Sequence, residues 1–149
     1  MTALVASEPE RGFRIDVSRY PFVEIVIRHV EDELDAYFAE LAAVLARPGP
    51  HVLLIDCTDS TLFRNEMRRR QLAFNAANRE RIRSTVSGVA FVVPSAVLRG
   101  ALTAAFWVQP FEADHVIVRS RDEGLSACHH WLSSVEPRRS DFPPPRTPR

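Results

Sequence analysis

Most of the side chains that could take part in binding or modification lie in two short stretches, residues 56–61 and residues 95–99. Asp56 ends an apolar run and Asp59 follows three positions later, and α/β sheets place ligand and active-site groups at such strand ends. Ser60 and Thr61 come next and offer hydroxyls for phosphorylation. Each group also has an ordinary role, because a turn aspartate accepts backbone N–H groups and a hydroxyl before a helix caps it. We expect these structural roles first, with Asp56 and Asp59 as interaction residues and Ser60 and Thr61 as phosphorylation candidates.

The second stretch contains Ser95 and Arg99. Ser95 follows Pro94 and occupies the N-cap position of an apolar segment, with Arg99 one helical turn further on. A helix N-terminus attracts phosphate or carboxylate, so this pair is a candidate anion site. In that case Phe106, Trp107 and Phe111 would line a pocket and Arg99 would hold an anionic headgroup. Alternatively, Ser95 is a plain cap and Arg99 points to solvent or pairs with a carboxylate.

Other patterns disfavour metal, cofactor and catalytic chemistry. The histidines lack metal-ligand spacing, and the adjacent His129 and His130 point to different faces of a helix. Cys57 has no recognisable nucleophile motif around it, and the five glycines form no phosphate-binding loop. We therefore expect no metal site, no cofactor and no enzymatic activity. An enzyme using Asp56 and a histidine would need those groups to converge in a cleft.

Composition narrows the class of protein. A chain of 149 residues with 46% hydrophobic residues can bury the core of one domain without metals or disulfides. The balance of 19 basic and 19 acidic residues argues against nucleic acid as a partner. No apolar run reaches the length of about 18 residues that spans a bilayer, and no signal peptide is visible. With two cysteines in apolar surroundings, we expect a reduced, cytoplasmic protein without a membrane span.

Residues 86–108 are the stretch around which the chain is organised. Val86–Val93 is typical of a strand covered on both faces, and Ala96–Val108 predicts a helix that is apolar almost all the way round. Such a helix is expected to be buried on more than one side, or to meet a partner or a ligand. Small side chains let helices approach closely, which makes a homodimer plausible through residues of this helix: Ala101, Ala104, Ala105 and Trp107.

The remaining patterns give the order of elements. Strands are expected at 13–17, 22–27, 51–56, 86–93 and 114–119, and helices at 31–46, 64–84, 96–108 and 122–132. The predicted fold class is therefore α/β, in the order β-β-α-β-α-β-α-β-α, with a mixed, mostly parallel sheet and an N-terminal antiparallel hairpin. Residues 1–12 are expected to be a flexible tail, 13–134 a single domain, and 135–149 a disordered tail rich in Pro and Arg.

Charge is unevenly distributed between two of the predicted helices. The helix at 64–84 carries seven arginines against two glutamates, whereas the stretch 30–46 carries five acidic residues and no basic one. A solvated face is the ordinary explanation for such a pattern. Alternatively, the two charged surfaces could attract each other, a second subunit or a charged partner.

This order resembles the STAS domain, the SpoIIAA-like fold of anti-sigma-factor antagonists. The resemblance covers about residues 13 to 132 and lies in the hairpin at 13–27, the strand and loop at 52–61, the unit at 89–95 and Asp122–Leu125 before Trp131-Leu132. It implies a non-enzymatic cytoplasmic interaction module, sometimes switched by phosphorylation of a serine. The family's Asp-Ser-Ser-Gly motif is replaced here by Asp59-Ser60-Thr61-Leu62-Phe63. The chain is also similar to uncharacterised bacterial STAS/Sec14-like proteins.

Two functions follow from these observations. The first is a regulatory or scaffolding module that binds a protein partner, or a second copy of itself, through the apolar helix at 96–108 and the loop at 57–63. The second is a small-molecule or lipid-binding protein with a pocket near Arg99, Phe106 and Trp107.

Overall fold

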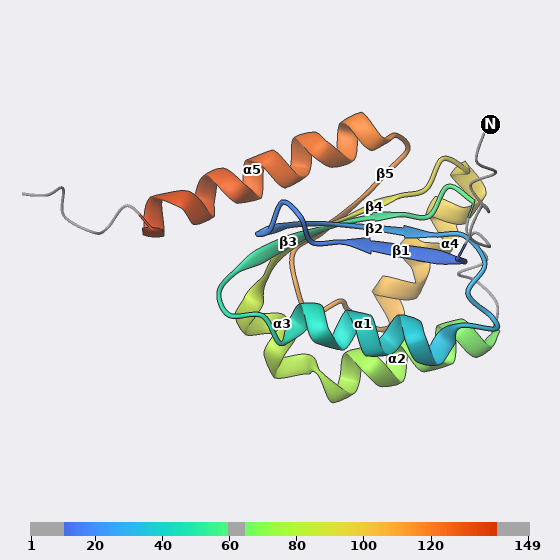
Figure 1. The fold of residues 1–149 in the computed structure, drawn as a ribbon. Coiled ribbons are helices and arrows are strands. Elements are labelled where there is room, and N and C mark those ends of the chain that lie inside the picture. The colour runs from blue at the N-terminus through green and yellow to red at the C-terminus, as the bar shows by residue number, and fades with distance from the viewer. Residues whose placement is uncertain (1–10, 60–64, 140–149) are drawn as a thin grey trace, which may run out of the picture.

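A computed structural model describes residues 11–59 and 65–139, with side chains described up to residue 134. The chain forms a five-stranded sheet flanked by helices on both faces (Figure 1). The strands are β1 (Phe13–Asp16), β2 (Phe22–Ile27), β3 (His51–Asp56), β4 (Val86–Val92) and β5 (His115–Val118). The helices are α1 (Leu34–Leu45), α2 (Asn65–Ala77), α3 (Arg79–Thr85), α4 (Ala96–Val108) and α5 (Arg121–Arg139). Among the residues described, no helix is both long and apolar enough to cross a membrane.

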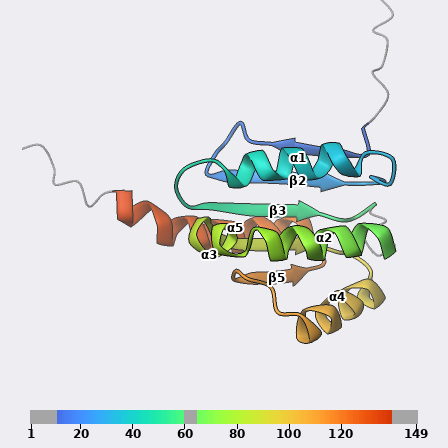
Figure 2. The same ribbon diagram turned by 90° about the horizontal axis from the view of Figure 1, so that it is seen from below.

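The strands lie in the sheet in the same order as in the chain, β1-β2-β3-β4-β5. The hairpin strand β1 is antiparallel to β2 at one edge, and all other neighbours are parallel, which confirms the predicted mixed sheet. Right-handed crossovers that always step in the same direction must all pass over the same face. Helices α1 to α4 therefore cover one face, called here the crossover face, and α5 alone covers the other, the α5 face (Figures 1 and 2).

Helix α1 packs on the crossover face through an apolar stripe along one side. Leu34, Phe38, Leu41 and Leu45 are all buried there, together with Tyr37 and Val44. The helix begins at Leu34 rather than at residue 31. Glu33 occupies the N-cap position, and its carboxylate accepts a hydrogen bond from the Gly12 backbone N–H at 2.6 Å. This acidic side chain ties down the start of β1 instead of forming part of the first helical turn.

The single helix predicted at 64–84 is wrong, because the chain breaks it at Asn78. The side-chain amide and the backbone N–H of Asn78 both donate to the carbonyl oxygen of Phe74, at 2.9 Å and 3.0 Å. Asparagine competes in this way for the backbone acceptors of a helix. The break redirects the chain into the short helix α3, which places Ile82 in the core.

Close approach of backbone and side chains closes the α5 face. The Trp131 ring lies directly on Gly88 of β4, and a Cβ at Gly124 would lie only 2.6 Å from Leu54 Cδ1. Both positions therefore require glycine for steric reasons. Helix α5 continues to Arg139 instead of ending near Leu132, so the backbone of residues 133–139 is helical and passes the domain boundary expected at 134.

Helix α4 differs most from expectation. Of the two alternatives predicted for it, burial on more than one side is wrong, because none of its residues is buried, and contact with a partner or a ligand stays a prediction. Val97, Trp107 and Val108 are 80%, 83% and 88% exposed. The reason is topological: α4 connects β4 to the edge strand β5 and lies beyond the edge of the sheet (Figure 2), so only Leu98, Leu102 and Phe106 reach the core.

Candidate functional site

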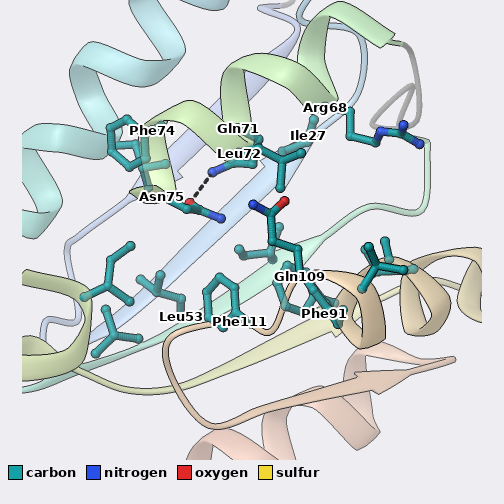
Figure 3. Close-up of a pocket in the computed structure, with 18 of the residues that line it drawn as sticks. Ile27, Leu53, Arg68, Gln71, Leu72, Phe74, Asn75, Phe91, Gln109 and Phe111 are labelled. Atoms are coloured by element: carbon teal, nitrogen blue, oxygen red, sulfur yellow. Dashed lines mark hydrogen bonds between the residues drawn. The ribbon is translucent and has the colours of Figure 1, made fainter. Parts of the chain in front are cut away.

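An apolar crevice lies on the crossover face between α2 and α4 (Figure 3). Its volume is about 480 Å³. Leu53 and Ile55 of β3 and Phe91 of β4 contribute to its floor. The walls come from α2 and α4 and from parts of α1, α3 and the segment after α4. The wall residues include Tyr37, Leu41, Leu45, Leu72, Phe74, Ile82, Ala101, Leu102, Ala104, Ala105, Phe106, Val108 and Phe111.

The spacing of residues on the two helices explains why space remains between them. On α2, the lining positions 68, 71, 72 and 75 follow one another at helical spacing and form one continuous side. On α4, the residues directed toward the crevice include Ala101, Ala104 and Ala105, whose side chains are too short to reach across it. Small residues at these positions therefore leave a cavity where larger ones would close it.

A few polar side chains stand among these apolar walls: Arg68, Gln71, Asn75 and Gln109. Gln71 Nε2 donates to Asn75 Oδ1 at 2.9 Å, and the Gln109 amide reaches toward this pair from the end of α4 (Figure 3). Arg68 is the only charged residue that lines the crevice within the part of the chain described. An apolar cavity with a small number of placed polar groups is typical of small-molecule sites.

Aromatic rings form the wall near β5. Phe91, Phe106 and Phe111 all contact one another, with ring centroids 5.5 to 5.9 Å apart. The His115 ring completes the group, with its centroid 4.7 Å from that of Phe106. Edge-to-face and tilted pairs at such distances stabilise each other beyond the area they bury. This wall therefore has a defined shape although α4 itself is largely exposed.

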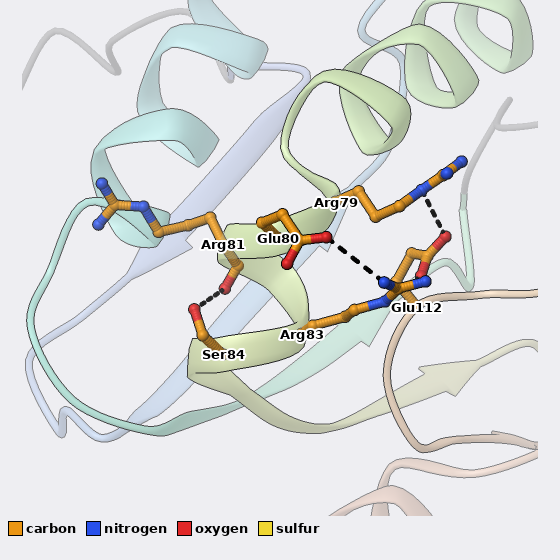
Figure 4. Close-up of polar contacts among 6 residues, drawn as sticks. All are labelled: Arg79, Glu80, Arg81, Arg83, Ser84 and Glu112. Carbon is orange, nitrogen blue, oxygen red and sulfur yellow. Dashed lines mark hydrogen bonds and ion pairs between the residues drawn. The ribbon is translucent and has the colours of Figure 1, made fainter.

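A pair of arginines holds the segment that carries Phe111 (Figure 4). Arg79 Nε lies 2.9 Å from Glu112 Oε1, and Arg83 Nε lies 2.8 Å from Glu112 Oε2. Each carboxylate oxygen thus has its own guanidinium partner from α3. The Glu112 side chain is only 18% exposed, which strengthens both ion pairs relative to pairs in open water. This clamp fixes the connection between α4 and β5 against α3, next to the crevice.

The loop after β3 shows the expected structural chemistry. Asp56 Oδ1 accepts hydrogen bonds from the Thr58 backbone N–H at 2.9 Å and from its hydroxyl at 2.6 Å, which closes a turn. Asp59 is exposed. The phosphorylation candidates Ser60 and Thr61 lie outside the described residues, so their role stays a prediction.

Ser95 and Arg99, the candidate anion site, both make contacts to the backbone, and anion binding there stays a prediction. Ser95 Oγ accepts a hydrogen bond from Leu98 N at 3.3 Å and caps α4. Arg99 Nη1 donates to the carbonyl oxygens of Val93 and Pro94, at 3.0 Å and 2.7 Å. Arg99 thus serves the backbone at the end of β4 rather than a carboxylate, and it does not line the crevice.

The sequence predicted a ligand pocket near Arg99, Phe106 and Trp107; the crevice lies beside Phe106, and its use as a ligand site stays a prediction. Phe106 lines the crevice, whereas the exposed Trp107 and Arg99 do not. Ala101, Ala104 and Ala105 also line it, although sequence reasoning placed them in a homodimer interface. Phe111 was also expected to line the pocket and does, whereas the sequence did not point to Arg68 or Gln109. The spacing of positions 68, 71, 72 and 75 along one helix side was the signal available for Arg68.

Among the residues that the structure describes, an ion pair joins the two charged helices. Arg70 Nη2 of α2 lies 2.7 Å from Asp35 Oδ1 of α1, and the same guanidinium lies over the Phe38 ring, 5.2 Å from its centroid. Arg81 Nη1 donates to the Leu45 carbonyl oxygen at 3.4 Å. Part of the positive charge of this region therefore holds α1, α2 and α3 together.

Burial raises the pKa values of two thiols and a tyrosine hydroxyl, which makes these groups less reactive. Burial raises the pKa of the Cys57 thiol well above its usual value, and it raises the pKa of Cys128 to about 11. Both thiols therefore remain protonated at neutral pH, whereas reactive cysteines need a lowered pKa. Burial also raises the pKa of the Tyr37 hydroxyl in the crevice wall. Within residues 11–59 and 65–134, no three His, Cys, Asp or Glu side chains gather closely enough to hold a metal ion.

Comparison with known proteins defines the fold. No protein-family model matches the sequence, and no curated protein matches it significantly. The chain is similar to the crystal structure of an uncharacterized protein of the DUF3478 family with a SpoIIAA-like fold, from Shewanella loihica PV-4. The two superpose with a TM-score of 0.61 over 82% of this chain and 98% of that chain, at 16% sequence identity. The protein therefore has the SpoIIAA-like fold, as the order of its elements predicted.

Proposed function

We propose that this SpoIIAA-like domain is a binding module that holds an apolar small molecule in the crevice between α2 and α4. The crevice itself carries the proposal. Its volume of about 480 Å³ falls within the range of about 300 to 1,000 Å³ typical of small-molecule sites, and its walls are almost entirely apolar. The ligand class agrees with the second function expected from the sequence, but the site lies beside Arg68 rather than Arg99.

The lining favours binding over catalysis. Arg68 and Tyr37 are the only titratable side chains among the described lining residues, and an arginine remains protonated in proteins. General acid–base chemistry needs a group that exchanges a proton near neutral pH. The raised pKa of the Tyr37 hydroxyl makes it unsuitable as such a group. We therefore propose a non-enzymatic role.

Binding of a neutral, polarity-sensitive dye such as Nile red tests this proposal. Ala105→Trp would fill the space between α4 and α2, and we expect it to weaken dye binding at least about tenfold, since a filled cavity excludes the ligand. Val97→Trp is the matched control, because Val97 is 80% exposed on the same helix and does not line the crevice. Failure of the dye to bind the unmodified protein, or equal loss in both variants at unchanged circular dichroism, would contradict the proposal.

A second function rests on the outward surface of α4. Val97 and Trp107 expose large apolar side chains there and do not line the crevice, and exposed apolar side chains that gather on one surface mark interaction sites. We propose this surface as the place where the domain meets a protein partner or a second copy, in keeping with the interaction module that the STAS resemblance implies. It replaces the alanine surface expected from the sequence, because those alanines face the crevice.

Self-association through this surface is measurable by sedimentation at increasing protein concentration. We expect a dimer that Trp107→Glu disrupts, since a carboxylate in an apolar interface loses its hydration. Ser133→Glu on α5 is the control, because Ser133 is exposed on the opposite face. A strict monomer at millimolar concentration would exclude the homodimer.

A further inference from the structure

Arg68 occupies a distinctive place in the crevice. It is the only charged lining residue among those described, and it lies near the start of α2, seven residues before Asn75. At 1.5 Å per residue, this part of α2 spans about 10 Å along the crevice. Its guanidinium is directed away from the apolar lining (Figure 3), which places a positive charge at one end of an otherwise uncharged cavity.

Arg68 is also the arginine of this region without a partner in the described protein. Helices α2 and α3 contain five other arginines, and each has a contact within the chain. Arg69 pairs with Glu66, Arg70 with Asp35, and Arg81 with the Leu45 carbonyl oxygen. Arg79 and Arg83 share Glu112. No hydrogen bond or ion pair joins Arg68 to any residue in 11–59 or 65–134, so its planar donor fork is available to an external group.

The size of the crevice limits what can lie beside that charge. The volume of about 480 Å³ lies within the range of about 300 to 1,000 Å³ typical of sites for one small molecule. One extended chain is a ligand of that class. A single guanidinium matches the two oxygens of a carboxylate, and its one positive charge balances the one negative charge of that group, whereas a phosphate monoester carries more negative charge than one arginine neutralises.

We infer that the ligand is a single-chain amphiphile with a terminal carboxylate, whose head is bound by Arg68 and whose apolar chain lies between α2 and α4. This inference rests on the proposed binding function and deepens it by naming the ligand class. The chain contacts Leu102 and Phe106 of α4 over the floor made by β3 and β4. Gln71, Asn75 and Gln109 lie along the opening, where their amides can accommodate water or a second polar group of the ligand.

Two probes with the same chain and different heads test the inference, dodecanoate and dodecanol, each displacing Nile red at pH 8. We expect the unmodified protein to bind dodecanoate about fivefold more tightly, the upper end of the effect for an exposed ion pair. Arg68→Gln should remove this preference while leaving dodecanol binding unchanged. Arg69→Gln is the matched control, since Arg69 is adjacent, exposed and paired with Glu66, and it should keep the preference.

The possible outcomes separate the two proposals. If dodecanol and dodecanoate bind equally, or if Arg68→Gln keeps the preference, the carboxylate assignment is overturned and the crevice remains a binding site. If neither probe nor the dye binds, the proposed function fails as well. A preference that disappears at about 1 M salt would support the ion pair, because the screening length there is about 3 Å.

Discussion

The two faces of the sheet are closed to different extents. On the α5 face, Trp131 rests on Gly88, Gly124 brings the helix backbone against Leu54 and Val92, and Cys128 is buried. On the crossover face, α4 buries none of its residues and leaves a crevice beside it. One face is packed to the density of a protein interior, whereas the other keeps space for a ligand.

Small residues produce both results. The glycines of the α5 face let a helix and a strand touch. The space that a larger side chain would occupy is filled by the Trp131 ring at Gly88 and by methyl groups of Leu54 and Val92 at Gly124. The alanines of α4 face α2 across the crevice, and their side chains are too short to reach the other helix. The space that larger side chains would fill therefore remains empty. The consequence of a small residue thus depends on how near the opposite element lies, and the connection of α4 to the edge strand β5 keeps it away.

The largest effect is expected from Gly88→Val. The new side chain would overlap the Trp131 ring, and neither a β-strand nor a docked helix can move easily. We expect a loss of about 3 kcal/mol in the free energy of unfolding, at the upper end for overpacked cores, measured by urea denaturation. The control on the other face is Gly100→Ala in α4, where no atom lies within 4 Å of the added Cβ. That change should stabilise the protein by about 0.5–1 kcal/mol, because alanine favours helix. Equal losses in both variants would erase the contrast between the faces.

A smaller effect is expected at the ion pair of the α5 face. Glu24 is a buried carboxylate in β2, and its two oxygens accept from Arg121 Nε and Nη2 at 3.2 Å and 3.0 Å. Glu24→Gln removes the charge that Arg121 pairs with. Since Arg121 is half exposed and can be hydrated, we expect a loss of about 1 kcal/mol in urea denaturation. Glu40→Gln, at the exposed pair with Arg11, is the control and should change stability by less than about 0.5 kcal/mol.

On the crossover face, Glu112→Gln should affect binding more than stability. The change weakens both contacts to Arg79 and Arg83 and releases the segment that carries Phe111. We expect a loss of about threefold in Nile red affinity and of less than about 1 kcal/mol in stability, since the arginines remain hydrated. Glu80→Gln also removes a partner of Arg83 but leaves Glu112 in place, and its affinity should be unchanged. Equal affinities for the two variants would show that the clamp does not shape the crevice.

The smallest expected effect is a pH dependence from His51, on the crossover face. Its ring is fully buried beside Tyr20, and burial lowers its pKa below the ordinary value of 6.5. Above pH 6.5 both folded and unfolded states hold a neutral ring, so His51 adds no pH dependence. Below pH 6.5 the unfolded state takes up the proton more readily, so the free energy of unfolding falls.

The measurement is urea denaturation between pH 7 and pH 5. His51→Leu should flatten this part of the curve, whereas His130→Gln, at an exposed position on α5, should leave the slope as it is. An unchanged slope in His51→Leu would show that other groups cause the acid sensitivity.

The sequence predicted those features of the fold that depend mainly on residues close together in the chain. The hairpin, the buried strands, the turn at Asp56 and the cap at Ser95 all form as their residue types predict. The break at Asn78 was not readable, because asparagine is common within helices and only the core position of Ile82 reveals the bend. The exposure of α4 was also missed, since it follows from the order of strands and not from the composition of the helix.

A pocket was expected near Arg99, Phe106 and Trp107, and the crevice lies beside only one of these three residues, while its ligand function stays a prediction. Phe106 was expected to line a pocket and does, while the expected cation Arg99 is held by the carbonyl oxygens at the end of β4. Arg68 belongs to a helix whose arginines all looked alike in sequence. Only the three-dimensional contacts show which of them are engaged elsewhere.

The two tryptophans of the chain lie on the two different faces of the sheet, Trp131 in α5 and Trp107 in α4. Trp131 is partly covered where it rests on Gly88, and Trp107 is 83% exposed on the helix that borders the crevice. The molecule thus carries two intrinsic fluorophores, one for each side of the sheet. Iodide should quench the emission of Trp107 and spare that of Trp131, so a single unlabelled sample can report separately on events at α4 and at α5.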